Sequence, residues 1–448
     1  MKYALGNMLN GAGGLNADQL ALDLQFAADK TLTARRGPTP ILTRGSTATF
    51  VGSNGLIQTA AVNAARFDHD PVTLASRGLL IEEGRTNLSL YSGEIVIGAG
   101  WGASATTSIV DGLGPDENNA YRIAETTATA SHNLGNSGGT TASSATSVVL
   151  GTVYTGSIFI KKVSGSVDWI QVTLGSGGFG TVQYANFNIG NGTVGNSAGL
   201  ASGTSPRIEN YGNGWYRLSI SATATATTAT NNVVLGFIQN TNGTTRLPSY
   251  AGSTSNSILA SLCQFEAGSF ATSYIPTTTS ALARSADVCS ITGAGFTGMW
   301  NALEGSLFTS AIFNAPVGSS IDQIAVDVND ATTANRLRYF RNVNNSFPRM
   351  LNTSNSTTDV DIVGVLALSS FVTQKFSTGF NSNDYVLYVN NAQIGTDNLA
   401  TLPISPTTFT IGTSGVGVTP IIPLNGTIAS IRYYKKRLSN QKLQALTV

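Results

Sequence analysis

The segment Gln264–Ala286 has the sequence QFEAGSFATSYIPTTTSALARSA and decides how the chain divides into domains. It begins as a strand, because Gln264 and Glu266 alternate with apolar neighbours. The alternation stops at Gly268, and Pro276 is followed by three threonines, which predicts an extended segment that does not re-enter a helix. Stretches in which polar and apolar residues alternate lie on both sides of this segment. The segment therefore predicts the last strand of one β-domain and the connection to a second one.

The composition favours short strands joined by tight turns. The chain has 448 residues, enough for two or three domains that each bury a core, and 49 of them are glycine. Charged residues make up 11% and the formal net charge is +1, so no basic field recruits nucleic acid and no acidic surplus attracts cationic partners. Surfaces with few Lys and Glu residues are desolvated at low cost, which favours permanent assembly.

We predict an all-β fold of two tandem antiparallel β-sandwiches (jelly rolls) preceded by an extended, β-rich N-terminal arm. Residues 1–84 have sparse apolar content and a glycine-rich start, so we interpret them as an attachment and oligomerisation region that adds to a neighbouring domain or to other copies. Within this region Leu20–Ala28 is expected to form one strand. Residues 85–287 and 288–448 are each expected to form a sandwich, because short strands follow one another without an intervening helical pattern.

The strands of both sandwiches are predicted from alternation and from turns rich in Gly and Asn. Those of the first sandwich are Tyr121–Glu125, Val153–Lys161, Trp169–Leu174, Val182–Ile189, Trp215–Ala222, Val233–Ile238 and Ser257–Glu266. Those of the second are Ser306–Phe313, Ile321–Val328, Arg336–Arg341, Phe371–Phe380, Tyr385–Val389, Thr408–Ile411 and Gly426–Tyr434. A short closing helix is expected at Ser439–Leu446, with Ser439 as its N-cap.

Cysteine usage and the N-terminus indicate folding in a cytosol. Cys263 and Cys289 are too few for a disulfide framework, and we expect two reduced, buried thiols, although a bridge between the ends of the segment is conceivable. The N-terminus has no basic stretch followed by a long apolar run, so we expect no signal peptide. No run of apolar residues approaches the roughly 18 that a membrane span needs, so no membrane insertion is expected.

Several stretches resemble known families. Ala27–Pro71, followed by RGLLIEEGRTNLSLYS at Arg77–Ser92, resembles the N-terminal region of bacteriophage head-spike and tail-fibre proteins. GNGWYRLSIS at Gly212–Ser221, together with residues 264–288, is similar to a phage sandwich domain of carbohydrate-binding-module type. DYVLYVNN at Asp384–Asn391 and residues 424–446 resemble the laminin-G-like, concanavalin-type jelly roll.

The resemblance implies a non-enzymatic structural protein of a bacteriophage virion, a spike or fibre subunit on head or tail. We expect it to be made in the host cytoplasm, to assemble as a homotrimer, to contact other virion proteins through the arm and to adsorb to host surface polysaccharide. Two alternatives stay open. One is a glycan-degrading appendage enzyme, a depolymerase, and the other is a capsid decoration protein.

Catalytic chemistry finds little support in the sequence. Neither metal-ligand spacing nor a nucleophile or nucleotide motif is present. Glycosidases need two carboxylic acids, and the paired candidates are Glu82/Glu83, Asp68/Asp70, Asp116/Glu117 and Asp359/Asp361. We favour the interpretation that arginines at the domain junction neutralise the first four of these acids. The arginines in question are Arg66, Arg77 and Arg85.

Two kinds of binding site are candidates. Glycan binding uses exposed aromatic rings beside polar side chains, and the available aromatics are Tyr211, Trp215, Tyr216, Tyr385 and Tyr388. Each of these rings alternatively belongs to a core. The loop DGLGPDEN offers hard oxygen donors for calcium, an ion that sandwich modules of this type often hold by resemblance. Its donors are Asp111, Asp116, Glu117 and Asn118, and an acidic turn also explains them.

Overall fold

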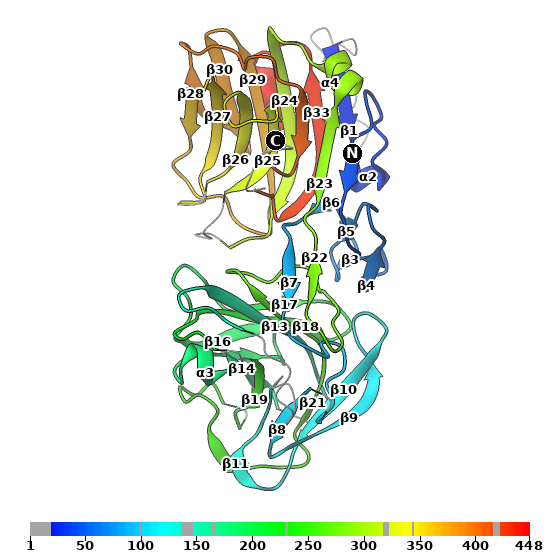
Figure 1. The fold of residues 1–448 in the computed structure, drawn as a ribbon, viewed down its shortest axis with the longest axis vertical. Coiled ribbons are helices and arrows are strands. Elements are labelled where there is room, and N and C mark those ends of the chain that lie inside the picture. Colours follow the sequence, from blue (N-terminus) through cyan, green and yellow to red (C-terminus); the bar gives the residue numbers. More distant parts are fainter. Residues whose placement is uncertain are drawn as a thin grey trace.

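The computed structural model describes residues 19–98, 100–135, 147–163, 167–228, 232–239, 241–316, 322–342, 345–414 and 422–448. Two β-sandwiches lie one after the other along the long axis of the molecule (Figure 1). The predicted all-β fold class is therefore confirmed. The first 18 residues of the expected arm lie outside the described residues, as does Ile321 at the start of one expected strand.

The first sandwich packs two six-stranded sheets against each other. One sheet has the order β17 (Arg207–Asn210), β18 (Trp215–Thr223), β13 (Val153–Lys162), β21 (Ser257–Ala267), β10 (Asn119–Glu125) and β9 (Thr106–Leu113). The other has the order β16 (Thr193–Ala198), β15 (Tyr184–Asn188), β14 (Trp169–Leu174), β19 (Val233–Phe237), β12 (Asn133–Gly135) and β8 (Gly102–Ser104). Alternation sends Leu218 and Ile220 of β18 into the shared core, so Arg217 and Ser219 face outward.

Smaller elements complete this sandwich. Helix α3 (Ser176–Phe179) follows β14, and β11 (Thr129–Ser131) pairs with β20 (Ser249–Ala251). The seven strands expected here are all present, whereas the sequence did not predict β8, β9, β11, β12, β16, β17 or β20.

The second sandwich consists of an eight-stranded and a seven-stranded sheet. The larger has the order β31 (Ala392–Asp397), β30 (Asp384–Val389), β29 (Thr373–Asn381), β24 (Glu304–Phe313), β33 (Gly426–Tyr434), β6 (Ser76–Ile81) and β5 (Phe67–His69), with β1 (Leu20–Leu24) also paired to β33. The smaller has the order β2 (Ile41–Thr43), β23 (Val288–Thr292), β32 (Thr408–Ile411), β25 (Gln323–Asn329), β26 (Arg336–Arg341), β27 (Pro348–Ser354) and β28 (Thr357–Val363).

The N-terminal segment is part of this second sandwich. β1 and β6 both pair with β33, and β2 pairs with β23. Leu22, Leu24 and Phe26 are fully buried in the same core as Phe376 and Tyr433. The sheet therefore crosses the expected boundary at residue 84. The expected strand Leu20–Ala28 ends early, because helix α2 (Phe26–Asp29) begins just beyond β1.

Two adjacent strands connect the sandwiches. β7 (Arg85–Asn87) leads into the first sandwich and pairs antiparallel with β22 (Leu282–Arg284), which leads out of it (Figure 1). The hairpin of β3 (Ala48–Val51) and β4 (Ile57–Ala60) reaches the first sandwich, where Ile57 N–H donates to the Pro115 carbonyl at 2.8 Å. The first sandwich is thus an insertion between the N-terminal strands and the rest of the second sandwich.

Local details agree with the predicted Asn-rich turns, helix N-cap and buried thiols. Asn390 and Asn391, both with positive φ, form the turn between β30 and β31. Helix α5 (Asn440–Leu446) is capped by Ser439, whose Oγ accepts from Lys442 N–H at 3.4 Å. Cys263 and Cys289 are free and buried, each in the core of a different sandwich.

Helices are few and short. Helix α4 (Gly293–Met299), which the sequence did not predict, follows β23 and packs Phe296 and Met299 into the core of the second sandwich. No helix in the part of the chain that the structure describes is long and apolar enough to cross a membrane.

Candidate functional site

The segment after β21, residues 268–277, lies across the outer face of the first sandwich and is called the strap. Gln264 and Glu266 of β21 point to this face and hold the strap through its backbone. Thr272 N–H donates to Glu266 Oε1 at 2.9 Å, and Ile275 N–H donates to Gln264 Oε1 at 2.7 Å. The sequence predicted an extended segment here. The polar residues that alternate along β21 supply the side chains that hold this segment in place.

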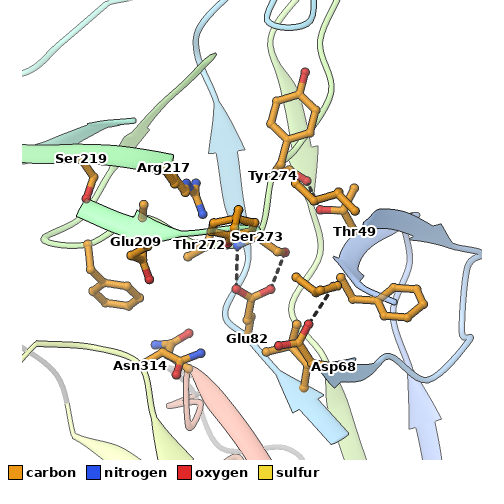
Figure 2. Close-up of a pocket in the computed structure, with 18 of the residues that line it drawn as sticks. Thr49, Asp68, Glu82, Glu209, Arg217, Ser219, Thr272, Ser273, Tyr274 and Asn314 are labelled. Atoms are coloured by element: carbon orange, nitrogen blue, oxygen red, sulfur yellow. Dashed lines mark hydrogen bonds between the residues drawn. The ribbon is translucent and has the colours of Figure 1, made fainter. Parts of the chain in front are cut away.

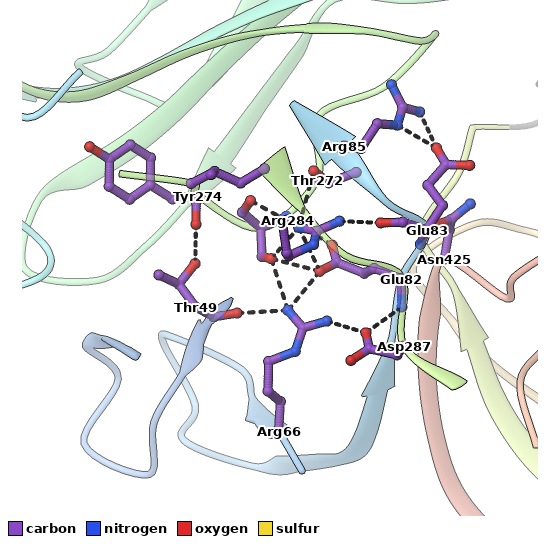
Figure 3. Close-up of polar contacts among 12 residues, drawn as sticks. Thr49, Arg66, Glu82, Glu83, Arg85, Thr272, Tyr274, Arg284, Asp287 and Asn425 are labelled. Atoms are coloured by element: carbon purple, nitrogen blue, oxygen red, sulfur yellow. Dashed lines mark hydrogen bonds and ion pairs between the residues drawn. The ribbon is translucent and has the colours of Figure 1, made fainter. Parts of the chain in front are cut away.

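A buried ion cluster lies beside the strap, where the two sandwiches meet (Figure 3). Arg66 forms ion pairs with Glu82, at 2.7 Å, and with Asp287. Arg44 also binds Asp287, at 3.0 Å, and Arg284 lies 3.1 Å from Glu82. Burial alone would raise the pKa of Glu82, but the charges of Arg284 and Arg66 and hydrogen bonds from the strap outweigh it and lower the pKa to about 2.

The neutralisation of acids by arginines at the junction is confirmed. Arg77 Nη2 lies 2.9 Å from Asp70 Oδ2, and Arg77 Nη1 lies 3.9 Å from Asp68 Oδ2. Arg85 pairs with Glu83. Sequence reasoning missed Arg44, Arg284 and Asp287, because contacts across more than 200 residues leave no local pattern.

Next to the cluster is a cleft lined by the outer face of the first sandwich, the strap, the β3–β4 hairpin and the near end of the second sandwich. Its volume is about 90 Å³, which is room for several water molecules at roughly 10–15 Å³ each. Figure 2 shows Arg217, Glu209 and Thr272 on one side of the cleft and Asn314 on the other. The cleft therefore suits one polar group or the edge of a larger ligand.

Arg217 is the least neutralised charge in this cleft. It is only 4% exposed, and its Nη2 and Nε donate to Ser157 Oγ at 3.0 and 3.3 Å. Its guanidinium carbon lies 5.4 Å from the centre of the Phe159 ring. Glu209, its cross-strand neighbour, pairs instead with Arg207 at 2.9 Å. Arg217 therefore forms no ion pair with any residue that the structure describes.

Asp68 gives the cleft a carboxyl group with a shifted pKa. Its Oδ1 accepts from Val51 N–H at 2.8 Å. Burial raises its pKa to about 6, although the Val51 hydrogen bond and the Arg77 charge act in the opposite direction. Asp68 and Glu82 thus have pKa values shifted in opposite directions, a pattern also found in acid–base pairs. Both oxygens of Glu82, however, accept hydrogen bonds from Ser273, at 2.8 and 2.6 Å.

The predicted glycan-binding aromatics separate into two groups. Trp215, Tyr385 and Tyr388 are at most 4% exposed and belong to apolar clusters, so their rings do not offer a face to a sugar from solvent. Tyr211 and Tyr216 are half-buried. Tyr211 lines the cleft and packs edge-on against Phe159 with ring centroids 4.7 Å apart.

The hydroxyl of Tyr211 is held in its protonated form. Burial raises the pKa of Tyr211 to about 12, against the opposing effect of neighbouring Arg217. Of the five aromatics, Tyr211 is the one that the structure places in the cleft.

The candidate calcium loop does not assemble into a metal site. Asp111 lies on β9 and pairs with Arg122. Asp116 instead accepts from the side-chain amide of Asn118 at 2.7 Å, and Glu117 N–H donates to the Gly114 carbonyl at 3.1 Å. Across the described ranges, no three His, Cys, Asp or Glu side chains gather closely enough to hold a metal ion. The acidic-turn interpretation accounts for these contacts.

Asp359 and Asp361 also have partners in the second sandwich. Asp361 forms two hydrogen bonds with Arg349, at 2.6 and 2.7 Å, and Asp359 accepts from Thr401.

The similarities between this chain and known proteins are distant. No protein-family model matches the chain, and no curated protein matches it. Among solved structures, it is similar to the CBM40 module of the Ruminococcus gnavus IT-sialidase bound to α2,3-sialyllactose, with 18% identity and a TM-score of 0.30 over 34% of this chain and 86% of that one.

Two further solved structures show comparable similarity. Domain 4 of the extracellular arabinanase AbnA of Geobacillus stearothermophilus, in complex with arabinotriose, has 10% identity and a TM-score of 0.30 over 40% of this chain and 82% of that one. A pentraxin of Limulus polyphemus has 9% identity and a TM-score of 0.26 over 33% of this chain and 70% of that one. Similarities this distant transfer no ligand or activity to the chain.

Proposed function

We propose that the chain is a non-enzymatic structural subunit of a bacteriophage virion, a spike or fibre, that binds host surface glycans through the cleft between its sandwiches. One observation carries the glycan-binding part. Ser219 and Asn314 line the cleft, and their side chains have no hydrogen-bond partner among the described residues, whereas the carboxylates that line the cleft are already engaged. Such a surface binds hydroxyl-rich ligands without supplying free acids for cleavage.

The virion assignment rests on the resemblances of residues 27–71, 77–92, 212–221 and 264–288 to phage appendage proteins. The charge-poor composition, 11% charged residues, supports a surface that is packed against other subunits. On this proposal the chain assembles as a homotrimer. Size-exclusion chromatography with light scattering should give three times the chain mass, and a stable monomer at micromolar concentration would contradict it.

Depolymerase activity is the competing proposal, because Asp68 and Glu82 have opposite pKa shifts in one cleft. We rank it lower because Glu82 is engaged by Arg66, Arg284 and Ser273, which leaves Asp68 without a free second acid. Incubation with host surface polysaccharide separates the two proposals. We expect no new reducing ends, whereas release that disappears in Asp68→Asn would favour the enzyme.

Capsid decoration is the third proposal, and the location of the chain on the particle distinguishes it. An electron-microscopy map of the particle should place the chain on a projecting spike or fibre. Density lying flat on the shell, bridging neighbouring head subunits, would favour decoration instead.

A further inference from the structure

We propose that Arg217 makes the cleft selective for a carboxylate carried on the saccharide, so that the preferred ligand is an acidic polysaccharide such as a polyuronate. This inference rests on the proposed glycan binding and names its chemical class. Burying a guanidinium costs free energy, and this cost is offset only by an anion or by a full set of hydrogen-bond acceptors.

Other buried arginines of the chain have such partners. Arg66 and Arg44 bind carboxylates. Arg341, in the second sandwich, has no carboxylate partner in the described part of the chain but donates to Ser370 Oγ at 2.8 Å and to the backbone carbonyls of Leu368 and Ala315. Arg217, in contrast, donates to the neutral Ser157 hydroxyl, forms no ion pair with a described residue, and lines the cleft. The missing acceptor is therefore one that enters from outside.

A carboxylate is the smallest of the common oxyanions that a guanidinium binds. The guanidinium is planar, and its parallel N–H groups match the two oxygens of a carboxylate. Glu209 does not compete for it, because Glu209 is paired with Arg207. A carboxylate is small enough for the 90 Å³ of the cleft, whereas the remainder of a sugar chain extends outside it.

Two further groups are placed to bind the sugar itself. Ser219 follows Arg217 on the same face of β18 and is 5% exposed, and Asn314 lies across the cleft on the second sandwich. The side chains of both lack hydrogen-bond partners among the described residues, and both residues line the cleft. Since they come from different sandwiches, a bound sugar would bridge the two domains.

The test titrates the intact chain with oligogalacturonate, with its carboxyl-reduced, neutral counterpart of equal length, and with acetate and inorganic sulfate, by isothermal calorimetry. We expect tight binding of oligogalacturonate only. Loss of a charged hydrogen bond costs roughly 10- to 100-fold in affinity, so Arg217→Met should weaken binding by about that factor. Arg349→Met, which removes an exposed ion pair outside the cleft, should bind like the natural chain.

The outcomes separate this inference from the proposed function. Equal binding of the acidic and neutral oligomers, unchanged in Arg217→Met, would overturn the inference and leave glycan binding standing. Binding of acetate or sulfate without either oligomer would overturn both the saccharide assignment and the proposed function. If Arg217→Met does not fold, the comparison of acidic and neutral oligomers on the natural chain decides the selectivity. Asn314→Ala then locates the ligand in the cleft: its half-buried side chain has no partner in the described structure, so its loss should lower the affinity for oligogalacturonate several-fold.

Discussion

Arg66 and Asp287 lie 221 residues apart in the sequence and form a buried ion pair where the two sandwiches meet. Arg66 precedes β5, whereas Asp287 directly precedes β23. The pair therefore joins the segment before the inserted sandwich to the segment after it. Glu82, the second carboxylate that pairs with Arg66, also binds the strap. The Arg66 guanidinium therefore connects the segment before the inserted sandwich, the strap of that sandwich and the segment after it.

Removing this guanidinium should destabilise the whole chain. Arg66→Met leaves Glu82 and Asp287 buried with less compensation, and breaking a buried pair from one side costs roughly 3–5 kcal/mol of unfolding free energy. Urea denaturation measures the loss. The control is Arg35→Met, which removes an exposed pair with Asp29 and should leave the unfolding free energy nearly unchanged. Equal effects of the two substitutions would contradict a structural role for the cluster.

The unfolding free energy should depend on pH through Asp68. Its folded pKa of about 6 lies above the unfolded value of 3.8, so its contribution is fully present below pH 3.8 and is lost as the pH rises through 6. The loss is on the order of 3 kcal/mol by the rule of 1.36 kcal/mol per pKa unit. Asp68→Asn should remove this fall, which urea denaturation between pH 4 and 8 measures. Parallel curves for the two proteins would show that the burial of Asp68 does not control its protonation.

Glu82 should act with the opposite sign. Its folded pKa of about 2 lies below the unfolded value of 4.5, so its contribution is present above pH 4.5 and is lost as the pH falls through 2. Glu82→Gln should therefore be most destabilising at neutral pH, and its difference from the natural chain should shrink in acid. Thermal melting at pH 7 and pH 3 measures this, and a difference that grows in acid would contradict the ion-pair account.

Gly78 tests how tightly the N-terminal strands join the second sandwich. It has φ of 97°, and an added Cβ would lie 2.1 Å from the Ile428 backbone oxygen, so Gly78→Ala must open the β6–β33 pairing. The control Gly293→Ala also has positive φ, at 57°, but meets no atom within 4 Å. We expect about 1 kcal/mol for the control and at least about 3 kcal/mol for Gly78→Ala in urea denaturation. Similar costs would mean that β6 is dispensable.

The two sandwiches should differ in whether they fold as separate fragments. Residues 85–284 keep both sheets of the first sandwich and their shared core, so this fragment should melt cooperatively. Residues 288–448 lose β1, β2 and β6, together with the buried Leu22, Leu24 and Phe26, and should not fold. Near-ultraviolet circular dichroism checks both fragments. A folded fragment 288–448 would show that the N-terminal strands only decorate its sandwich.

Local alternation predicted most strands but not their partners. β13 and β33 were found because their residues alternate, whereas β9 was missed because its apolar Ile109, Val110 and Leu113 are 57–61% exposed and do not mark a core face. The pairing of Leu22 with Tyr433 carries no local signal, so the inserted position of the first sandwich was not visible in the sequence.

The candidate site was only partly predictable, because segments distant in the sequence cover it. The strap and the β3–β4 hairpin cover the outer face of β18, so Trp215 is buried although it lies on that outer face. Arg217 was overlooked, although its place two residues after Trp215 puts it on that same face. An arginine two residues after a tryptophan in a predicted strand was the available signal.

The most direct test of the account is a single titration of the intact chain with host surface polysaccharide, in which bound sugar and new reducing ends are measured on the same samples. We expect saturable binding and a reducing-end signal that stays at its starting level. Absence of binding, or cleavage that rises with the amount of protein, would contradict the claim that the chain recognises host glycans without degrading them.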